Sequence, residues 1–193
     1  GKFAAFEILM REPPNGDTQA EARRILRERL AEVVKAELLL DDPSRREDLA
    51  LRLEAMDWLA FIAEQRDIAP FEAALASAEQ VVRWKAAKFV SSRAMWQSKE
   101  RLGRYAALLD SEQDGIRVTA AWLLRELHRE LTSSEGRRAP TPPAFNAFAN
   151  TEVRQAQAGE WRAWVATSEP IINAYAAQRK NVAGMPSGSG NER

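Results

Sequence analysis

The stretch "IRVTAAWLLREL" at residues 116–127 decides the fold, because its opening repeats an earlier stretch, "VRWKAAKFV" at residues 82–90. Each begins with an apolar residue and Arg, continues through two variable residues and reaches an Ala pair. The apolar positions of both recur near the 3.6-residue period of an α-helix. A pattern that returns after roughly thirty residues is typical of stacked helical units. The sequence therefore predicts two equivalent helices in neighbouring repeats.

Four arginines mark the repeat. Arg83 and Arg117 are 34 residues apart, and Arg154 follows after 37 more, while Arg52 precedes Arg83 by 31. Each is preceded by a predicted helix and an acidic or polar turn, which for Arg154 is "FNAFANTE" at residues 145–152. Such spacings predict helix, turn and helix as the unit, and Ala residues in mid-helix let neighbouring units pack closely. We expect each arginine to reach the turn of its own or an adjacent repeat.

The pattern resembles the HEAT-like repeat family, in particular the short bacterial type first described in phycobilisome lyases. The best match is "LGRYAALLDSEQDGIRVTAAWLLREL" at residues 102–127, followed by residues 68–90 and 145–165, and residues 36–59 match weakly. The resemblance implies a right-handed α-α superhelix, or solenoid, of about four helical pairs whose second helices line the concave face. Proteins built on it usually bind other macromolecules, although a fold of this kind does not define a function. The turn at residues 76–80 departs from the family pattern because it lacks the usual Asp.

Composition restricts the function. The chain has 193 residues, with 28 Lys and Arg, 28 Asp and Glu, and no Cys. A net charge of zero gives no general attraction to a polyanion, which disfavours non-specific nucleic-acid binding. The lack of Cys excludes disulfides and thiolate metal sites but leaves cytoplasmic and exported locations equally open. No apolar run approaches the roughly 20 residues of a membrane span, so none is predicted.

The chain organisation predicts one elongated all-α domain at residues 17–183, because helical periodicity recurs throughout and no alternating β pattern occurs. A loop insertion at residues 132–143 interrupts the stacking before the last unit. An N-terminal docking segment, residues 1–16, precedes this domain, and a disordered tail, residues 184–193, follows it. The helix expected at residues 169–182 would cap the solenoid.

Apolar periodicity predicts the first helices at residues 18–40 and 49–66. The stretches "DDPSRRED" at residues 41–48 and "RDIAP" at residues 66–70 are expected to break them, because each contains Pro. Further breaks are predicted at residues 77–79, 110–115 and 132–143.

Catalytic chemistry finds little support in the sequence. His128 is the only histidine, and it is expected to be a partly exposed helix residue; a multi-histidine metal site is excluded. The carboxylate pairs Asp41 with Asp42 and Asp110 with Asp114 lie in predicted turns, where capping and pairing with Arg are the expected roles. There is no Gly-rich phosphate loop. We therefore expect no catalytic residue, no cofactor and no metal.

Six tryptophans are more than usual for this length. Trp58, Trp161 and Trp164 fall on or beside the apolar faces of their predicted helices, which favours a role in packing.

Two other tryptophans differ, because the apolar stripe of residues 82–90 turns Trp84 outward. The same register turns Thr119 and Trp122 outward in the next repeat. An apolar strip would then cross two second helices on the concave face, where exposed aromatic residues anchor partners. The alternative is that a neighbouring helix, the insertion or the C-terminal helix covers them. The residues predicted to bind the partner are Trp84, Lys85, Lys88, Val118 and Trp122.

The sequence thus predicts a non-catalytic interaction module that binds a protein partner. The alternative is an enzyme, similar either to the lyases that share this repeat or to a HEAT-like DNA-base glycosylase. A glycosylase needs a basic groove, which the balanced charge disfavours, and no pigment-handling acid or base can be identified. A homodimer through the same strip stays open, because a self-complementary patch needs only two-fold symmetry.

Overall fold

The computed structural model describes residues 17–35, 45–132 and 141–183. These residues contain helices and connecting segments but no strand, which confirms the prediction of an all-α fold. None of the described helices is long and apolar enough to cross a membrane. The predicted docking segment and the predicted tail lie outside the described residues. The chain divides into two compact units, one ending at Phe71 and the other beginning at Glu72, and each is described by itself.

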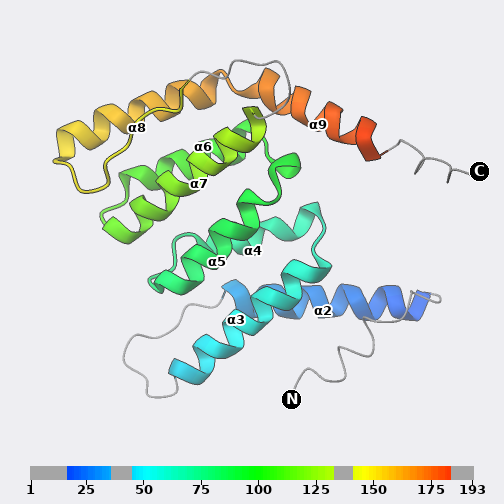
Figure 1. The fold of residues 1–193 in the computed structure, drawn as a ribbon. Coiled ribbons are helices and arrows are strands. Elements are labelled where there is room, and N and C mark those ends of the chain that lie inside the picture. The colour runs from blue at the N-terminus through cyan, green and yellow to red at the C-terminus, as the bar shows by residue number, and fades with distance from the viewer. Residues whose placement is uncertain (1–16, 36–44, 133–140, 184–193) are drawn as a thin grey trace, which may run out of the picture. The chain divides into compact units, whose positions relative to one another are not determined.

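The first unit is built on two long helices, α2 (Asp17–Lys35) and α3 (Arg45–Ile62), which cross in Figure 1. One face of α2 is buried through Leu26, Leu30 and Val34, whose spacing of four residues places them on one stripe. Residues 18–35 of the first predicted helix are helical, and the end predicted for it at residue 40 lies outside the described residues. The second predicted helix, 49–66, is present as far as Ile62. Helix α3 begins inside the predicted break at residues 41–48, and residues 36–44 lie outside the described part.

A short 3-10 helix, η1 (Gln65–Asp67), follows α3 and is held by a capping box. The backbone N–H of Glu64 donates to Asp67 Oδ2 at 2.8 Å, and Arg27 of α2 pairs with the Glu64 carboxylate. Helix α4 (Ile68–Ala74) then begins, so the predicted break at residues 66–70 is wrong for its last three residues. Pro70 is tolerated there because it lies in the first turn, where a backbone N–H has no partner within the helix.

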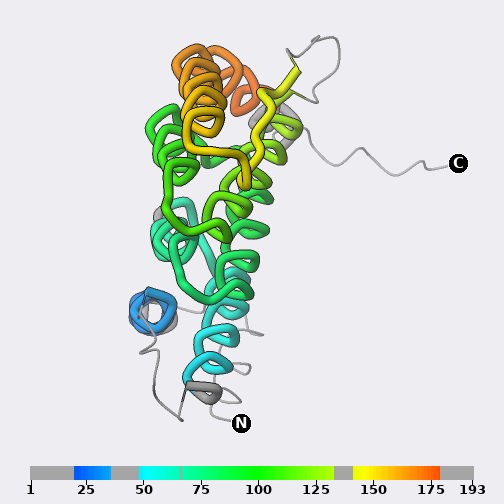
Figure 2. Tube along the Cα trace, turned by 90° about the vertical axis from the view of Figure 1, so that its left-hand side faces the viewer, coloured from blue at the N-terminus to red at the C-terminus, as the bar shows by residue number. Residues whose placement is uncertain are grey.

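The second unit is a two-layered arrangement of helices. Helix α5 contacts α7, and α6 contacts both α7 and α8. In Figure 2 α5 and α7 accordingly form one layer, and α6 and α8 form the other. After α4, the elements of this unit are α5 (Gln80–Ser91), η2 (Ala94–Trp96), α6 (Lys99–Ala107), η3 (Leu108–Asp110), α7 (Asp114–Thr132), α8 (Thr151–Ala166) and α9 (Glu169–Ala183).

The core of this unit lies between the layers, and α7 supplies much of it. Its buried apolar residues include Ile116, Leu123, Leu124, Leu127 and Leu131. The Ala pairs of the repeated stretch are also buried in α5 and α7, where a small side chain allows close approach of a neighbouring helix. The predicted breaks at residues 77–79 and 110–115 are present, although α7 begins at Asp114.

One break was not predicted. Between α5 and α6 the chain passes through η2, and α6 begins after Ser98, whose Oγ accepts a hydrogen bond from the backbone N–H of Arg101 at 3.3 Å. A serine in this position satisfies one of the free N–H groups of the first turn. The sequence signal for the start of α6 was therefore the N-cap residue Ser98, and not a Pro or a Gly.

The last predicted repeat departs from the other two. Residues 141–150 form no helix, so the helix expected at the start of "FNAFANTE" is wrong. Two carbonyls of this segment accept from α7 instead: Ala147 O from Arg117 Nε at 3.0 Å, and Phe145 O from Arg125 Nη2 at 2.9 Å. A helix would need such carbonyls for its own ladder. Helix α8, which carries Arg154, contacts α6 and therefore lies in the layer of α6 rather than continuing the row of α5 and α7.

The C-terminal helix of the described chain, α9, agrees with the helix expected at residues 169–182. It contacts α7 and η2. Tyr175 of α9 donates a hydrogen bond from its hydroxyl to Glu130 Oε1 of α7 at 2.7 Å. The helix therefore packs near the end of α7.

Candidate interaction surface

Two arginines of the repeat fix the starts of α5 and α7 through the same set of contacts. Arg83 Nη1 donates to the backbone carbonyls of Ser77 and Ala78, both at 2.7 Å. Arg117 Nη1 donates to the carbonyls of the equivalent turn residues, Ser111 at 2.6 Å and Glu112 at 2.9 Å. In both turns the arginine reaches back six and five residues. Each guanidinium thus closes the turn that precedes its own helix.

The same two side chains also reach the next segment in the chain. The guanidinium of Arg83 lies against Gly115 at the start of α7, and Arg117 Nε donates to Ala147 O. Both arginines are buried, and burial lowers the pKa of Arg83 from its ordinary value, although a guanidinium remains charged at neutral pH. These contacts hold α5 and α7 in a defined register.

The other two arginines show a different set of contacts among the described residues. Arg52 is buried in α3 and donates from Nε to Val34 O at 2.9 Å, at the end of α2. Arg154 is half-buried; its Nη1 donates to Ala149 O at 2.8 Å and its Nη2 to Thr151 Oγ1 at 3.2 Å. Only the turn contact, without a bridge to a following segment, is present at Arg154 among the described residues.

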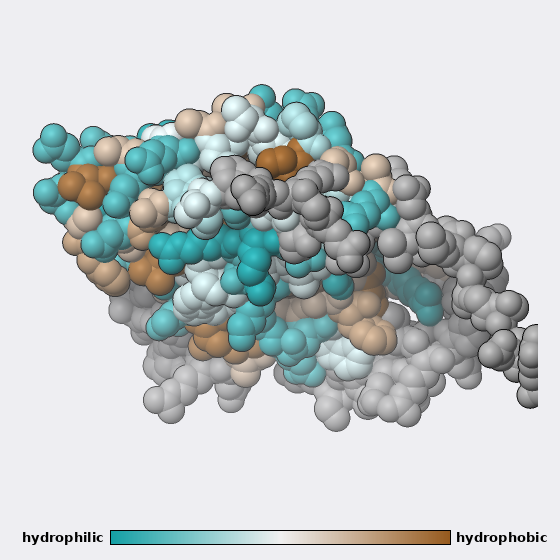
Figure 3. All heavy atoms as spheres, turned by 45° about the horizontal axis from the view of Figure 1, so that its top comes forward, coloured by the Kyte–Doolittle hydropathy of each residue, from teal (hydrophilic) through white to brown (hydrophobic). Residues whose placement is uncertain are grey.

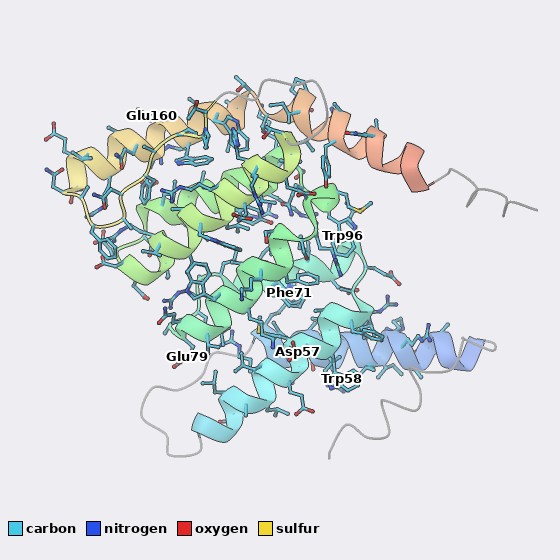
Figure 4. All side chains as sticks on the ribbon, viewed as in Figure 1. Asp57, Trp58, Phe71, Glu79, Trp96 and Glu160 are labelled. Carbon is cyan, nitrogen blue, oxygen red and sulfur yellow. The ribbon has the colours of Figure 1, made fainter. Side chains whose placement is uncertain are left out.

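Arg83 fixes the start of α5. One stripe of this helix faces the core, and another faces away from it. Val81 is 46% exposed, Trp84 and Lys85 are half-buried, and Lys88 is exposed. These positions are three or four residues apart or adjacent within one helical face. Figure 4 marks the two ends of this region, with Glu79 before the first turn of α5 and Trp96 in η2 beyond its last turn.

A matching stripe runs along α7 and meets the first. Val118 and Trp122 are half-buried, and Arg125 is exposed. The rings of Trp84 and Trp122 pack edge to face, with centroids 5.1 Å apart and planes at 71°. This geometry is favourable for aromatic pairs, because the positive edge of one ring meets the negative face of the other. The two helices therefore present one shared surface with a tryptophan pair at its centre.

We define the α5–α7 face by six residues: Val81, Trp84, Lys88, Val118, Trp122 and Arg125. The sequence identified four of these, together with Lys85, and missed Val81 and Arg125. Both missed residues were detectable, since each lies three residues from a tryptophan on the same helix. Lys88 and Arg125 have no carboxylate partner within the described residues; Arg125 donates only to Phe145 O.

One residue predicted to point outward does not. Thr119 is only 1% exposed, and its hydroxyl donates to the carbonyl of Gly115 at 2.9 Å. The bond to the preceding turn satisfies the hydroxyl within its own helix, so the small side chain can be buried without a separate polar partner. The outward stripe of α7 is therefore narrower than predicted.

The single histidine also corrects a prediction. His128 is buried, at 4% exposure, whereas a partly exposed helix residue was expected. Its ring lies 5.3 Å from the ring of Trp164 and 6.5 Å from that of Trp161, centroid to centroid. Both tryptophans are buried in α8, which confirms their predicted role in packing. Helix α8 covers His128 through these two tryptophans. The repeat pattern did not predict this position of α8.

Trp58, the third tryptophan assigned to packing, is half-buried in α3 of the first unit and is labelled in Figure 4.

For the acidic residues of the predicted turns, capping and pairing with Arg were expected. Asp110 Oδ2 accepts from Arg162 Nη1 at 2.6 Å, and Asp114 pairs with Arg117. Asp41 and Asp42 lie outside the described residues. Among the residues that are described, no group of three or more His, Asp or Glu is placed to hold a metal ion.

A buried tyrosine joins α6 to α4 within the second unit. The hydroxyl of Tyr105 donates to Glu72 Oε1 at 2.7 Å, and the other carboxylate oxygen accepts from Arg104 Nη2 at 2.9 Å. Burial, followed by the hydrogen bond to the Glu72 carboxylate, raises the pKa of Tyr105 well above its ordinary value. The hydroxyl therefore stays protonated at neutral pH and serves as a donor.

On the face of the molecule that Figure 3 shows, hydrophobicity does not mark out a docking surface. In the view of Figure 3, brown residues are scattered singly or in small groups among teal and white ones in the coloured part of the surface. On α8, Glu160 points away from the underlying helices, as Figure 4 shows. A groove of about 580 Å³ between η3 and α8 is lined by charges of both signs, which partly pair across it. The α5–α7 face combines aromatic and cationic groups instead.

Comparison with known proteins gives no relative from which a role for these residues could be inferred. No protein-family model, no curated protein and no solved structure matches the chain. The structure brings the predicted residues Trp84 and Trp122 into contact, with Lys85, Lys88 and Val118 on the same helices beside them.

Proposed function

We propose that this chain is a non-catalytic interaction module that binds a protein partner at the α5–α7 face. The observation that carries the proposal is the edge-to-face pair of Trp84 and Trp122, which remains half-exposed on two helices fixed by buried arginines. Tryptophan and arginine are the residues that most often dominate binding energy at protein interfaces. An aromatic pair on rigid helices is already ordered, so binding loses little conformational entropy.

We further infer that the second unit belongs to a solenoid of the HEAT-like type. Two features support this inference: the two layers of helices, and the arginine that closes the preceding turn in the same way at Arg83 and Arg117. Stacked repeats of this kind present one row of helices as a continuous binding surface. The face formed by α5 and α7 is such a row of two helices.

Site-specific photo-crosslinking in an extract of the source cells tests the proposed function. In one variant of the chain a photoreactive amino acid replaces Val81, which is exposed at the edge of the α5–α7 face. In a second variant it replaces Ala156, which is exposed on α8. We expect a discrete crosslinked protein at Val81 that is missing at Ala156. The two variants carry the same reactive group, so the comparison separates a specific face from general stickiness.

The proposal fails if both positions give the same crosslinked species, or if Ala156 gives a discrete product and Val81 gives none. Thermal melting of both variants before irradiation provides the control for folding, because each substitution replaces an exposed side chain and should leave the melting temperature nearly unchanged.

A further inference from the structure

The α5–α7 face carries an uneven charge in a chain that is neutral overall. Of the six residues that define it, Lys88 and Arg125 are basic and none is acidic. Over the full sequence, by contrast, 28 basic residues balance 28 acidic ones. A cationic surface in a balanced chain attracts negative groups locally, without drawing the whole molecule to a polyanion.

The positions of the cations relative to the tryptophans are regular. Lys88 follows Trp84 by four residues in α5, and Arg125 follows Trp122 by three in α7. Residues three and four apart are neighbours on a helix surface, so each tryptophan has a cation about one turn away on the same face. Val81 and Val118 extend the apolar centre on the N-terminal side of the tryptophans. The face is thus an apolar centre with cations along one side.

Two acidic residues of α7 already have basic partners of their own. On α7, Glu126 is paired with Arg129, and Asp114 is paired with the buried Arg117. Lys88 and Arg125, in contrast, lack a carboxylate partner in the described part of the chain. Their charges are available to a ligand at little cost, because no internal ion pair has to be broken.

We infer that the partner of the α5–α7 face is an acidic segment of another protein, with an apolar side chain that packs on the Trp84–Trp122 pair and carboxylates that meet Lys88 and Arg125. This inference rests on the proposed function and specifies its partner. Apolar contact supplies the central buried area, and the charges set orientation and association rate.

Two other occupants fit the same face less well. A second copy of this chain would present the same face, which has no acidic residue to pair with Lys88 and Arg125. Nucleic acid requires many phosphate contacts for useful affinity, and its binding scales with the number of cations that neutralise phosphates. The face provides few cations around an apolar centre, which matches a short acidic segment.

Fluorescence anisotropy with the full chain tests the inference. The probe is a labelled synthetic peptide in which glutamates flank a single phenylalanine. The comparison probes are the same peptide with lysines in place of the glutamates, the glutamate peptide with alanine in place of phenylalanine, and a labelled single-stranded DNA oligonucleotide. We expect the acidic phenylalanine peptide to bind most tightly and its affinity to fall as salt is raised, since screening weakens exposed charges.

The charge-reversal variant Lys88→Glu should weaken binding of this peptide at least tenfold, a change of about 1.4 kcal/mol. Lys35→Glu in α2 is the matched control, because Lys35 is also an exposed lysine on a helix and the change in net charge is identical. The control should stay within about twofold of the parent.

The outcomes separate this inference from the function on which it rests. If crosslinking succeeds at Val81 but the acidic peptide does not bind, the partner class is wrong while the interaction face stands. Tighter binding of the DNA, or an equal effect of Lys88→Glu and Lys35→Glu, would also overturn the inference. A dimer in sedimentation that Lys88→Glu strengthens would identify a second copy as the occupant and overturn it as well.

Discussion

The guanidinium of Arg83 lies directly against Gly115, although the two residues are 32 positions apart in the chain. A Cβ atom built at residue 115 would stand 3.1 Å from Arg83 Cζ and closer still to Nη2. Since Nη1 of the same guanidinium is held by two turn carbonyls, the group cannot move away without losing them. The glycine is therefore required by a close approach between α5 and α7.

The first prediction concerns this contact. Gly115→Ala should destabilise the protein by about 1–2 kcal/mol, although Ala favours helices, because the guanidinium has to give up its hydrogen bonds to the carbonyls of Ser77 and Ala78. Gly103→Ala in α6 is the matched control: nothing lies within 4 Å of its built Cβ, and the change should stabilise by about 0.5–1 kcal/mol. Urea unfolding measures both. In an Arg83→Ala background the cost of Gly115→Ala should disappear; an unchanged cost would refute the contact.

The arginines of the repeat should differ in energetic weight. Arg117→Lys should cost on the order of 2–4 kcal/mol, because one ammonium group cannot serve the carbonyls of Ser111, Glu112 and Ala147 together. Arg154→Lys should cost about 1 kcal/mol or less, since Arg154 is half-buried and makes only the local turn contact. The free energies of unfolding of the two variants provide the test, and equal losses would contradict the bridging role of Arg117.

The helical class was predictable because it depends on local periodicity. The apolar stripes of the described helices recur near 3.6 residues, and the predicted fold class follows directly from them. The same periodicity predicts that Trp84 and Trp122 point outward; in the structure both are half-buried and pack on one another. Thr119 was misplaced because a hydroxyl can be satisfied by its own helix, so a polar residue at the boundary of a stripe can be buried.

The rest depended on tertiary contacts that a repeat pattern does not contain. His128 is buried beside Trp161 and Trp164 of α8, and the segment before α8 is held against α7 by Arg117 and Arg125. Arg154 makes the turn contact that its match to Arg83 and Arg117 predicts. The match did not predict that its helix, α8, would lie in the layer of α6. Sequence similarity between repeats therefore identified a local turn, not the neighbour of the helix that follows it.

The tryptophan pair should couple energetically. Trp84→Ala and Trp122→Ala are each expected to cost about 1–2 kcal/mol, because both side chains are only half-buried. The double variant should cost less than the sum by about 0.5–1.5 kcal/mol, the value of an aromatic pair beyond its burial. Trp161→Ala is the comparison for a fully buried ring and should cost about 3–5 kcal/mol. Additive losses would argue against direct packing of Trp84 on Trp122.

Stability at alkaline pH should depend on Tyr105. Burial and its bond to Glu72 raise the folded-state pKa of Tyr105, whereas the unfolded chain has an ordinary tyrosine pKa of about 10. The stabilisation is therefore complete below pH 10 and is lost as pH rises above that value. Tyr105→Phe should cost about 1–2 kcal/mol near pH 8, and the difference from the parent should shrink near pH 11. A difference that stays constant between these pH values would contradict the assignment.

The measurement that tests the central claim most directly combines the crosslink at Val81 with removal of both tryptophans. The account predicts that the double variant Trp84→Ala, Trp122→Ala remains folded, with a cooperative thermal transition, and loses the crosslinked partner at Val81. Trp58→Ala, which truncates a half-buried tryptophan in the first unit, should keep the crosslink. If the folded double variant captures the same partner as the parent, the tryptophan pair is not the binding site and the account is wrong.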